Sequence, residues 1–282
     1  MPAVTDDSRV MESIELEAKI VICDSQVHAP PVPPEESPVG GLSRDELLAQ
    51  MSQVGVDRVV LVPLIPHTEE CFEFVEENPD RFSIMGVFPL TEGPEGYAKF
   101  REWKAQGKVR GLRVSFVAAE PREMLEAGEI EWLWEAADQD ALSVMVNIPD
   151  NVWRLEDVSA RYPNIRFLID HMGLSPRRKY SDFNEVLAPV LALAGRPNVA
   201  VKASCLPSSV EDGYPFKTIH EPLHQVIDAF GPGRVFWGSD LTRLPCTYSE
   251  CLRLFTDELP FLSERDRTLI LGEAVCAWLG WD

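Results

Sequence analysis

The chain has 282 residues, of which 45% are apolar, and its 26 basic and 46 acidic side chains give a formal net charge of −20. A surface this acidic repels the phosphates of nucleic acids and of anionic membranes. Neither is therefore expected as a partner. The sequence has no apolar run near the roughly 18 residues that cross a membrane, and its acidic N-terminal stretch lacks the apolar core of a signal peptide. We therefore expect a cytoplasmic protein with a small-molecule ligand, and homo-oligomerisation is left open.

The six cysteines show no Cys-x-x-Cys pair and no zinc-finger spacing. This usage is typical of buried, reduced thiols in a cytosolic protein. A disulfide framework and a structural zinc finger are therefore not expected.

Strands and helices are predicted to alternate along the chain after an N-terminal arm at residues 1–18. The predicted strands cover residues 19–23, 58–62, 82–88, 109–116, 142–148, 167–169, 199–203 and 234–237. The predicted helices cover residues 43–54, 69–77, 94–106, 130–139, 152–161, 182–194, 219–230, 248–257 and 263–279. Such alternation indicates a parallel sheet, and eight units in one domain, residues 19–282, indicate an α/β fold of the (β/α)8 or TIM-barrel type.

Chemistry in such a barrel lies at the carboxyl ends of the strands. Polar residues stand at these ends as follows: Gln26 and His28 after the first strand, Arg113 in the fourth, Asn147 in the fifth, His171 after the sixth, Lys202 in the seventh and Asp240 after the eighth. Each has an ordinary alternative role, since His171 could be a core histidine bonded to Asp170, and Asp240 a helix cap. Their convergence on one rim favours an active site.

Four short motifs carry a family resemblance: Asp24-x-x-x-His28, Asp170-His171-Met172-Gly173, Gly238-Ser239-Asp240 and Gly272-Glu273-Ala274. In this order the chain resembles the amidohydrolase superfamily, and within it the amidohydrolase-2 branch of lactonases, decarboxylases and related metal-dependent hydrolases. The resemblance spans about residues 20–281. It implies a distorted TIM barrel with a hydrolytic site at its rim.

The metal-binding pattern of that family is incomplete here. The family usually has His-x-His after the first strand and often a histidine after the fifth, where this chain has Gln26 and Asn147. Amide oxygens are poor zinc ligands. We therefore expect either no metal or a weakly bound zinc or manganese ion, with His28, His171 and Asp240 as its ligands.

The predicted reaction is hydrolysis of a cyclic ester (a lactone) or a related ring substrate. Asp240 would activate water, His171 and His28 would orient the water or polarise the carbonyl, and Lys202, Gln26 and Asn147 would contact the developing charge. A substrate carboxylate is expected because arginine binds carboxylates with a two-pronged fork, and three arginines lie near strand ends: Arg113, Arg177 and Arg243. The alternatives are a metal-dependent decarboxylase or amide hydrolase on the same barrel, and a non-catalytic ligand-binding barrel.

Overall fold

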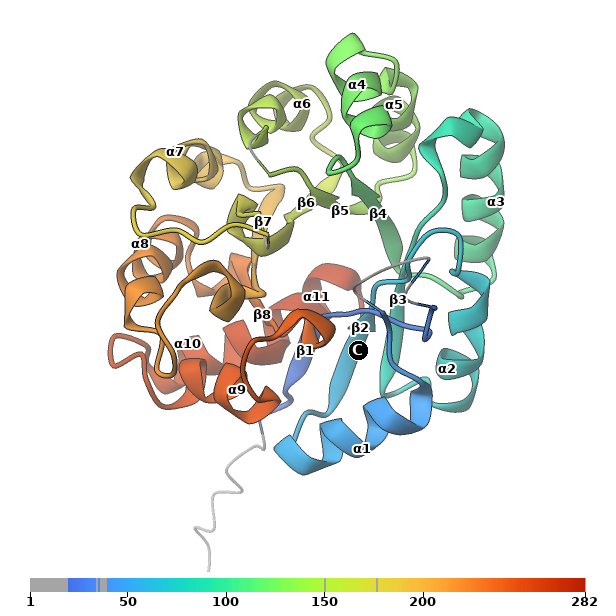
Figure 1. The fold of residues 1–282 in the computed structure, drawn as a ribbon. Coiled ribbons are helices and arrows are strands. Elements are labelled where there is room, and N and C mark those ends of the chain that lie inside the picture. Colours follow the sequence, from blue (N-terminus) through green and yellow to red (C-terminus); the bar gives the residue numbers. More distant parts are fainter. Residues whose placement is uncertain (1–19, 34, 36–39, 150, 176, 282) are drawn as a thin grey trace, which may run out of the picture.

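The computed structural model describes residues 20–33, 35, 40–149, 151–175 and 177–281, so the predicted arm lies outside the described residues. Eight parallel strands follow one another in chain order around a nearly closed barrel (Figure 1). The strands are β1 (Cys23–Val27), β2 (Arg58–Leu61), β3 (Phe82–Gly86), β4 (Gly111–Ser115), β5 (Ser143–Asn147), β6 (Arg166–Ile169), β7 (Val199–Ser204) and β8 (Val235–Gly238). The predicted fold class is confirmed.

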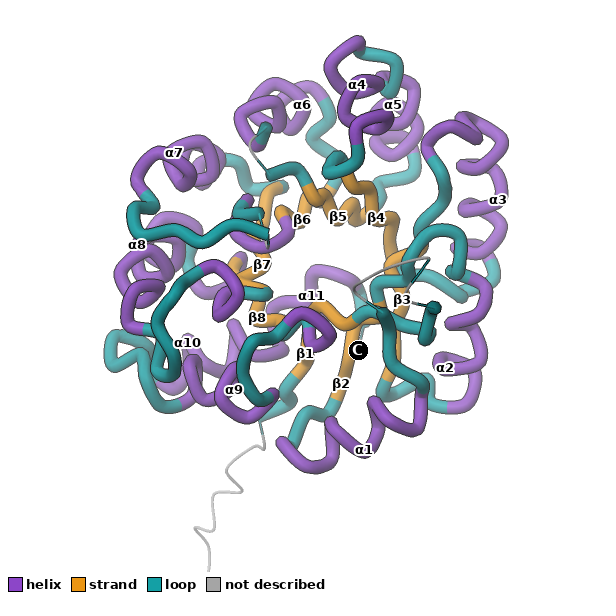
Figure 2. The backbone as a smooth tube through the Cα atoms, in the orientation of Figure 1, coloured by secondary structure: helices purple, strands orange, loops and turns teal. Residues whose placement is uncertain are grey.

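Helices surround the strands on the outside of the barrel, except the last one, which lies across the lower end (Figure 2). They are α1 (Arg44–Val54), α2 (Phe72–Glu77), α3 (Gly93–Ala105), α4 (Ala119–Ala127), α5 (Glu131–Gln139), α6 (Leu155–Arg161), α7 (Asn184–Ala192), α8 (His220–Phe230), α9 (Tyr248–Thr256), α10 (Glu264–Thr268) and α11 (Ala274–Leu279). A π-helical turn, Leu269–Glu273, joins α10 to α11. None of the helices in the described part of the chain is long and apolar enough to cross a membrane.

The interior of the barrel is layered because side chains alternate along each strand. The lower layer is apolar and consists of Cys23, Val60, Met85, Met145, Leu168, Ala200 and Phe236. The residue two positions after Met145, Leu168 or Ala200 lies on the same face of its strand, one layer higher. Those residues are Asn147, Asp170 and Lys202, and all three are buried. The alternation of side chains along the strands therefore places these polar groups at the upper end of the barrel.

The C-terminal helix closes the lower end. Residues of α11 share the apolar cluster of the lower layer, together with Trp281. Gly272, in the π-helical turn, packs directly on the backbone before β1, where an added Cβ would lie 2.0 Å from the Val21 carbonyl oxygen. The Gly272-Glu273-Ala274 motif thus serves the close contact between the last helix and the first strand.

One predicted strand is misplaced, and one helix was not predicted. The first strand covers Cys23–Val27 rather than residues 19–23, and Ile20 and Val21 are 36% and 42% exposed. A bulge in the β1–β2 register follows Asp24. In addition, α4 (Ala119–Ala127) was not predicted, because most of its side chains are polar or exposed and its sequence has no apolar stripe.

Candidate active site

Three strands end in backbone conformations that side-chain-bearing residues rarely adopt. His171 after β6, Cys205 after β7 and Asp240 after β8 have φ of 54°, 58° and 56°. Each such residue costs on the order of 1–3 kcal/mol, and such strain concentrates at functional sites. All three side chains are buried at the upper end of the barrel, the end that the strand alternation predicts for the chemistry.

The carboxylate of Asp240 is the centre of the site. His28 Nε2 lies 3.3 Å from Oδ1, and His171 Nε2 lies 3.9 Å from Oδ2. Arg243 Nε lies 3.3 Å from the same Oδ2. Asp240 is 0% exposed, yet neither oxygen accepts a hydrogen bond from the nitrogen and oxygen donors of the described residues. The Cys205 thiol also contacts this carboxylate, whose oxygens keep lone pairs that a ligand can use.

His28 directs an unprotonated nitrogen toward this carboxylate. His28 Nδ1 lies 2.8 Å from the Val62 carbonyl oxygen, which can only accept, so Nδ1 carries the proton and Nε2 the lone pair. His171 Nδ1 is hydrogen-bonded to the Ser204 hydroxyl at 2.9 Å. Burial lowers the pKa of His28 to about 4 and also lowers the pKa of His171, although Asp240 opposes both shifts. Both imidazoles are therefore neutral at pH 7.

A second buried cluster lies beside the first. Lys202 Nζ lies 3.3 Å from Asp170 Oδ1 and donates a hydrogen bond to Gln26 Oε1. Arg113 Nε donates to Asp170 Oδ2 at 3.2 Å. Burial alone would raise the pKa of Asp170, but Lys202 and Arg113 outweigh it and hold that pKa at about 2. Asp170 therefore pairs with two cations and is not the partner of the neighbouring His171.

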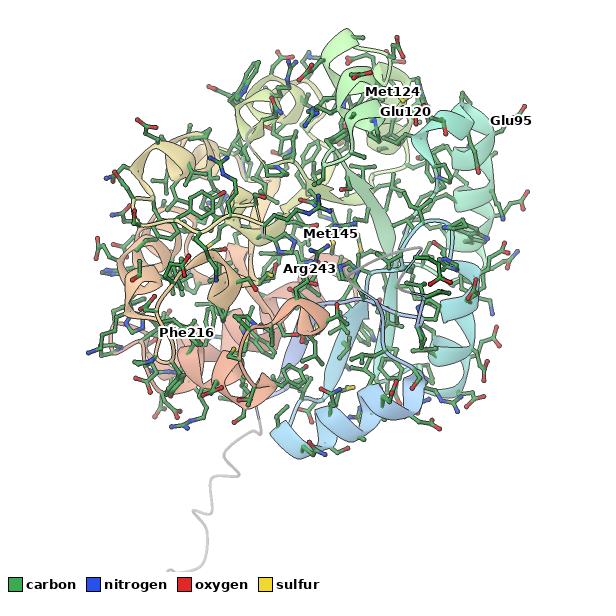
Figure 3. The ribbon with its side chains drawn as sticks, viewed as in Figure 1. Glu95, Glu120, Met124, Met145, Phe216 and Arg243 are labelled. Carbon is green, nitrogen blue, oxygen red and sulfur yellow. The ribbon has the colours of Figure 1, made fainter. Side chains whose placement is uncertain are left out.

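The polar groups predicted to contact substrate divide into buried and outer ones. Gln26 Nε2 and Asn147 Oδ1 are buried without a hydrogen-bond partner among the described residues. The side chains of Arg113 and Arg243 are 10% and 24% exposed, and they pair with the buried carboxylates of Asp170 and Asp240. Figure 3 shows Arg243 near the centre of the barrel in the view along its axis.

Arg177 stands apart from this group. It is exposed on the segment that follows β6, and its backbone N–H contacts the Ser175 hydroxyl at 3.4 Å. The structure brings the other predicted residues together around the barrel axis but leaves Arg177 outside them, so its contact with substrate stays a prediction.

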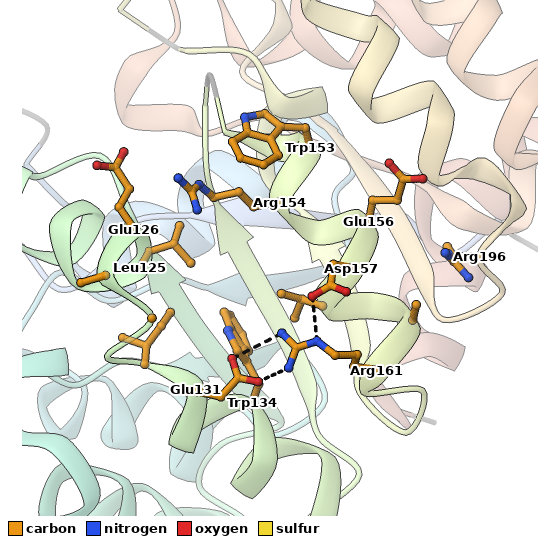
Figure 4. A pocket seen from close by; sticks show the side chains of 15 residues that line it. Leu125, Glu126, Glu131, Trp134, Trp153, Arg154, Glu156, Asp157, Arg161 and Arg196 are labelled. Atoms are coloured by element: carbon orange, nitrogen blue, oxygen red, sulfur yellow. Dashed lines mark hydrogen bonds and ion pairs between the residues drawn. The ribbon is translucent and has the colours of Figure 1, made fainter.

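A hollow on the outer wall is separate from this site. It measures about 710 Å³ and is lined by residues of α4, α5 and α6 (Figure 4). Arg161 spans it through ion pairs with Glu131 and Asp157, and Arg154 stacks 4.6 Å from the ring of Trp153. None of the residues around Asp240 lines it, so it is a surface groove and not the opening of the active site.

Comparison with known proteins assigns the family. The sequence model of the family described as Amidohydrolase matches residues 23–275. The chain belongs to the amidohydrolase family. The motifs at the ends of β1, β6 and β8 therefore sit in the chain of an amidohydrolase, as their order indicated.

Individual relatives of this amidohydrolase include a lactonase. The L-fucono-1,5-lactonase of Burkholderia ambifaria is 25% identical over 206 residues, which cover 67% of this chain and 66% of that enzyme. The structure of an amidohydrolase from Burkholderia multivorans with bound zinc has a TM-score of 0.77 and 19% identity, covering 92% of this chain and 99% of that one. A putative 2-pyrone-4,6-dicarboxylic acid hydrolase from Pseudomonas putida has a TM-score of 0.72 and 18% identity, covering 93% and 98%.

The donor set of this amidohydrolase fits a divalent metal. Donor atoms of His171, Cys205 and Asp240 all lie within 4.8 Å of one another, and His28 Nε2 adjoins the same carboxylate. The Nδ1 atoms of both imidazoles are held by protein oxygens, as is usual for metal-bound histidines. Sequence reasoning named His28, His171 and Asp240 but missed Cys205, because the cysteine spacings carried no metal signal.

Proposed function

We propose that this amidohydrolase hydrolyses a cyclic ester that carries a carboxylate. The observation that supports it most is the buried Asp240 carboxylate, whose oxygens accept no hydrogen bond from the described nitrogen and oxygen donors and which lies between two neutral imidazoles. The lactonase from Burkholderia ambifaria and the similarity to a putative pyrone dicarboxylic acid hydrolase support an ester ring as the electrophile.

Asp240 is suited to accept the proton of an attacking water. Burial alone would raise its pKa. The charges of His28 and His171, which are protonated in the acidic range where Asp240 titrates, and that of Arg243 outweigh this effect and hold the pKa below its usual value. The group is therefore ionised at neutral pH, while its burial leaves it poorly solvated. After attack on the carbonyl carbon, the same carboxyl group can return the proton to the ring oxygen as the carbon–oxygen bond breaks.

The two histidines orient this water. The lone pair on His28 Nε2 faces Asp240 Oδ1 at 3.3 Å, so a water beside both atoms can donate one hydrogen to each group. Its oxygen lone pair then points away from both. This tautomer makes His28 an acceptor, which supports the predicted orienting role over polarisation of the carbonyl.

The second cluster supplies donors for the carbonyl oxygen. Lys202 Nζ and the unpartnered Nε2 of Gln26 are held together by the hydrogen bond between Lys202 and Gln26 Oε1. Fixed donors of this kind stabilise the negative charge of a tetrahedral intermediate. Asp170 and Arg113 hold the ammonium in place through the ion pairs that they form.

A zinc or manganese ion held by His28, His171 and Asp240 would act as a Lewis acid and lower the pKa of the water. In that case the lone pair of His28 Nε2 would be used by the metal and not by the water, while Asp240 would still take the proton of the water. Arg243, at the outer side of Asp240, is the proposed partner of the substrate carboxylate.

The test is a panel of lactones and unsaturated ring esters, with and without a carboxylate, together with aromatic acids, assayed on metal-stripped protein and after addition of zinc or manganese. We expect ring opening, measured as proton release, with a preference for carboxylated members. Carbon dioxide release from aromatic acids without ring opening would instead favour the decarboxylase. Ligand binding without turnover across the panel would favour the non-catalytic barrel.

A further inference from the structure

We propose that Cys205 is a thiolate ligand in the metal site of this barrel and makes the site select zinc over manganese. The inference deepens the proposed function, since it concerns the metal preference of the same site. It assigns a role to a residue that neither the motif pattern nor the proposed reaction uses.

The position of Cys205 is the first observation that supports the inference. The residue directly follows β7, is 0% exposed and has φ 58° and ψ 17°. Successive side chains of a strand point to opposite faces, but a left-handed residue breaks this alternation. Ser204 can thereby hold His171 Nδ1 while the next residue, Cys205, places its sulfur within 4.8 Å of donor atoms of His171 and Asp240.

The buried polar atoms near Cys205 provide a second, independent observation. Both oxygens of Asp240 are buried without a hydrogen bond from the described nitrogen and oxygen donors, and the lone pair of His28 Nε2 faces Oδ1 at 3.3 Å. A buried carboxylate against an imidazole lone pair is unfavourable unless a cation or a proton lies between them. In the described part of the chain, His171, Cys205 and Asp240 form the one group of this kind that could hold a metal.

The chemistry of the donors decides which metal is favoured. Thiolate is a soft ligand that suits zinc, whereas carboxylate and water suit manganese. One sulfur, imidazole nitrogen and one carboxylate oxygen is a donor set in which zinc is commonly bound. Binding releases the thiol proton to solvent, so M²⁺ and R–SH give R–S–M⁺ and H⁺. A metal held through Cys205 therefore does not require the two family histidines that are replaced here by Gln26 and Asn147.

Metal binding and cobalt spectroscopy on the full chain test this inference. Metal-stripped wild type, Cys205→Ser and the control Cys246→Ser are titrated with zinc, cobalt and manganese. Cys246 is a suitable control because it is also a free cysteine but is only partly buried and lies outside the donor group. Circular dichroism verifies folding, and Cys205→Ala provides a second variant where the serine disturbs the packing.

We expect the cobalt form of the wild type and of Cys246→Ser to show the intense near-ultraviolet band of thiolate-to-cobalt charge transfer, and Cys205→Ser and Cys205→Ala to lack it. Zinc affinity should fall at least about tenfold on loss of Cys205, since even outer-shell changes cost this much. Manganese affinity should change much less. A wild type without the band, a Cys205 variant that keeps it, or equal losses for zinc and manganese would overturn the assignment.

Hydrolysis is scored separately on the same samples. Lactone hydrolysis by the wild type without a cobalt–thiolate band would remove Cys205 from the metal site and leave the proposed function standing. The band with no hydrolysis across the panel would leave the ligand assignment standing and remove the proposed function.

Discussion

The carboxylate of Asp24 binds Ser239 twice, accepting one hydrogen bond from its backbone N–H at 2.8 Å and another from its hydroxyl. Asp24 lies in β1, and Ser239 lies between β8 and Asp240. The strand order runs from β1 to β8, and this carboxylate links the first strand to the end of the last. It thereby fixes the backbone that carries Asp240 against the strand that leads to His28.

The ionisation of Asp24 should make stability depend on pH. Its four donors, from Gln26, Ser239 and Tyr248, are uncharged, and burial outweighs them and raises its pKa to about 6. The unfolded chain loses this proton near pH ~3.9. The folded state therefore holds a proton that the unfolded state has lost between these values, and the free energy of unfolding should fall as pH rises through them, by roughly 3 kcal/mol.

Urea unfolding of metal-stripped protein at pH 4.5 and pH 7 measures this effect as a difference between wild type and Asp24→Asn, which cannot ionise. As pH rises, the free energy of unfolding of Asp24→Asn should increase relative to that of the wild type. Asp45→Asn, an exposed position on α1, is the matched control and should follow the wild type. Identical pH dependence in wild type and Asp24→Asn would show that Asp24 does not titrate in this range.

The buried pair of Lys202 and Asp170 should behave as a coupled unit. Lys202→Met keeps the apolar stem but leaves a buried carboxylate with Arg113 alone, so we expect a loss of about 3–5 kcal/mol in the free energy of unfolding. Adding Asp170→Asn removes the unpaired charge and should recover part of that loss. Denaturant unfolding of the two single variants and the double variant measures the coupling, with Lys99→Met, about half exposed, as the control. Strictly additive effects would contradict the pairing.

Arg243 should govern recognition of a substrate carboxylate. Arg243→Ala removes a charge-assisted hydrogen bond worth about 1.5–3 kcal/mol, so KM for a carboxylated lactone should rise roughly tenfold or more. The uncharged methyl ester of the same lactone should show little change, which separates charge recognition from a disturbed Asp240. Arg177→Ala tests the exposed arginine that was also predicted to bind substrate, and a matching rise in KM would place Arg177 in the site. An unchanged KM in Arg243→Ala would exclude Arg243.

The alternation of strands and helices could be predicted because most strands are uninterrupted apolar runs. The start of β1 could not, because the buried segment Asp24-Ser25-Gln26 is polar and resembles a loop in sequence. Its burial depends on contacts with the end of β8, such as the hydrogen bond from the Asp240 N–H to the Gln26 carbonyl at 2.9 Å. A local sequence pattern contains no information about a contact with a residue more than two hundred positions away in the chain.

The same limit separates the predicted site residues from those that sequence reasoning missed. His28, His171 and Asp240 follow recognisable strands, so their meeting point follows from the barrel itself. Cys205 also follows a strand, but the direction of its side chain depends on its left-handed backbone conformation. Neither glycine nor asparagine stands there to indicate this conformation in the sequence. The ion pair of Asp170 could not be predicted without the pairing of β6 with β7, which places Lys202 close to its carboxylate.

The role of Asp240 as base is tested by Asp240→Asn, because the amide keeps the shape of the side chain but cannot take the proton of water. General-base catalysis contributes about 10²–10⁴-fold, so kcat on the preferred lactone should fall at least about a hundredfold. Asparagine tolerates the left-handed backbone at φ 56°, so the fold should be retained, as circular dichroism and the unfolding midpoint would show. Asp228→Asn, on the exposed face of α8, is the control and should keep full activity. A folded Asp240→Asn protein with activity near that of the wild type, in both metal-stripped and zinc-loaded samples, would mean that another group takes the proton. The proposed mechanism would then be wrong, whatever the substrate.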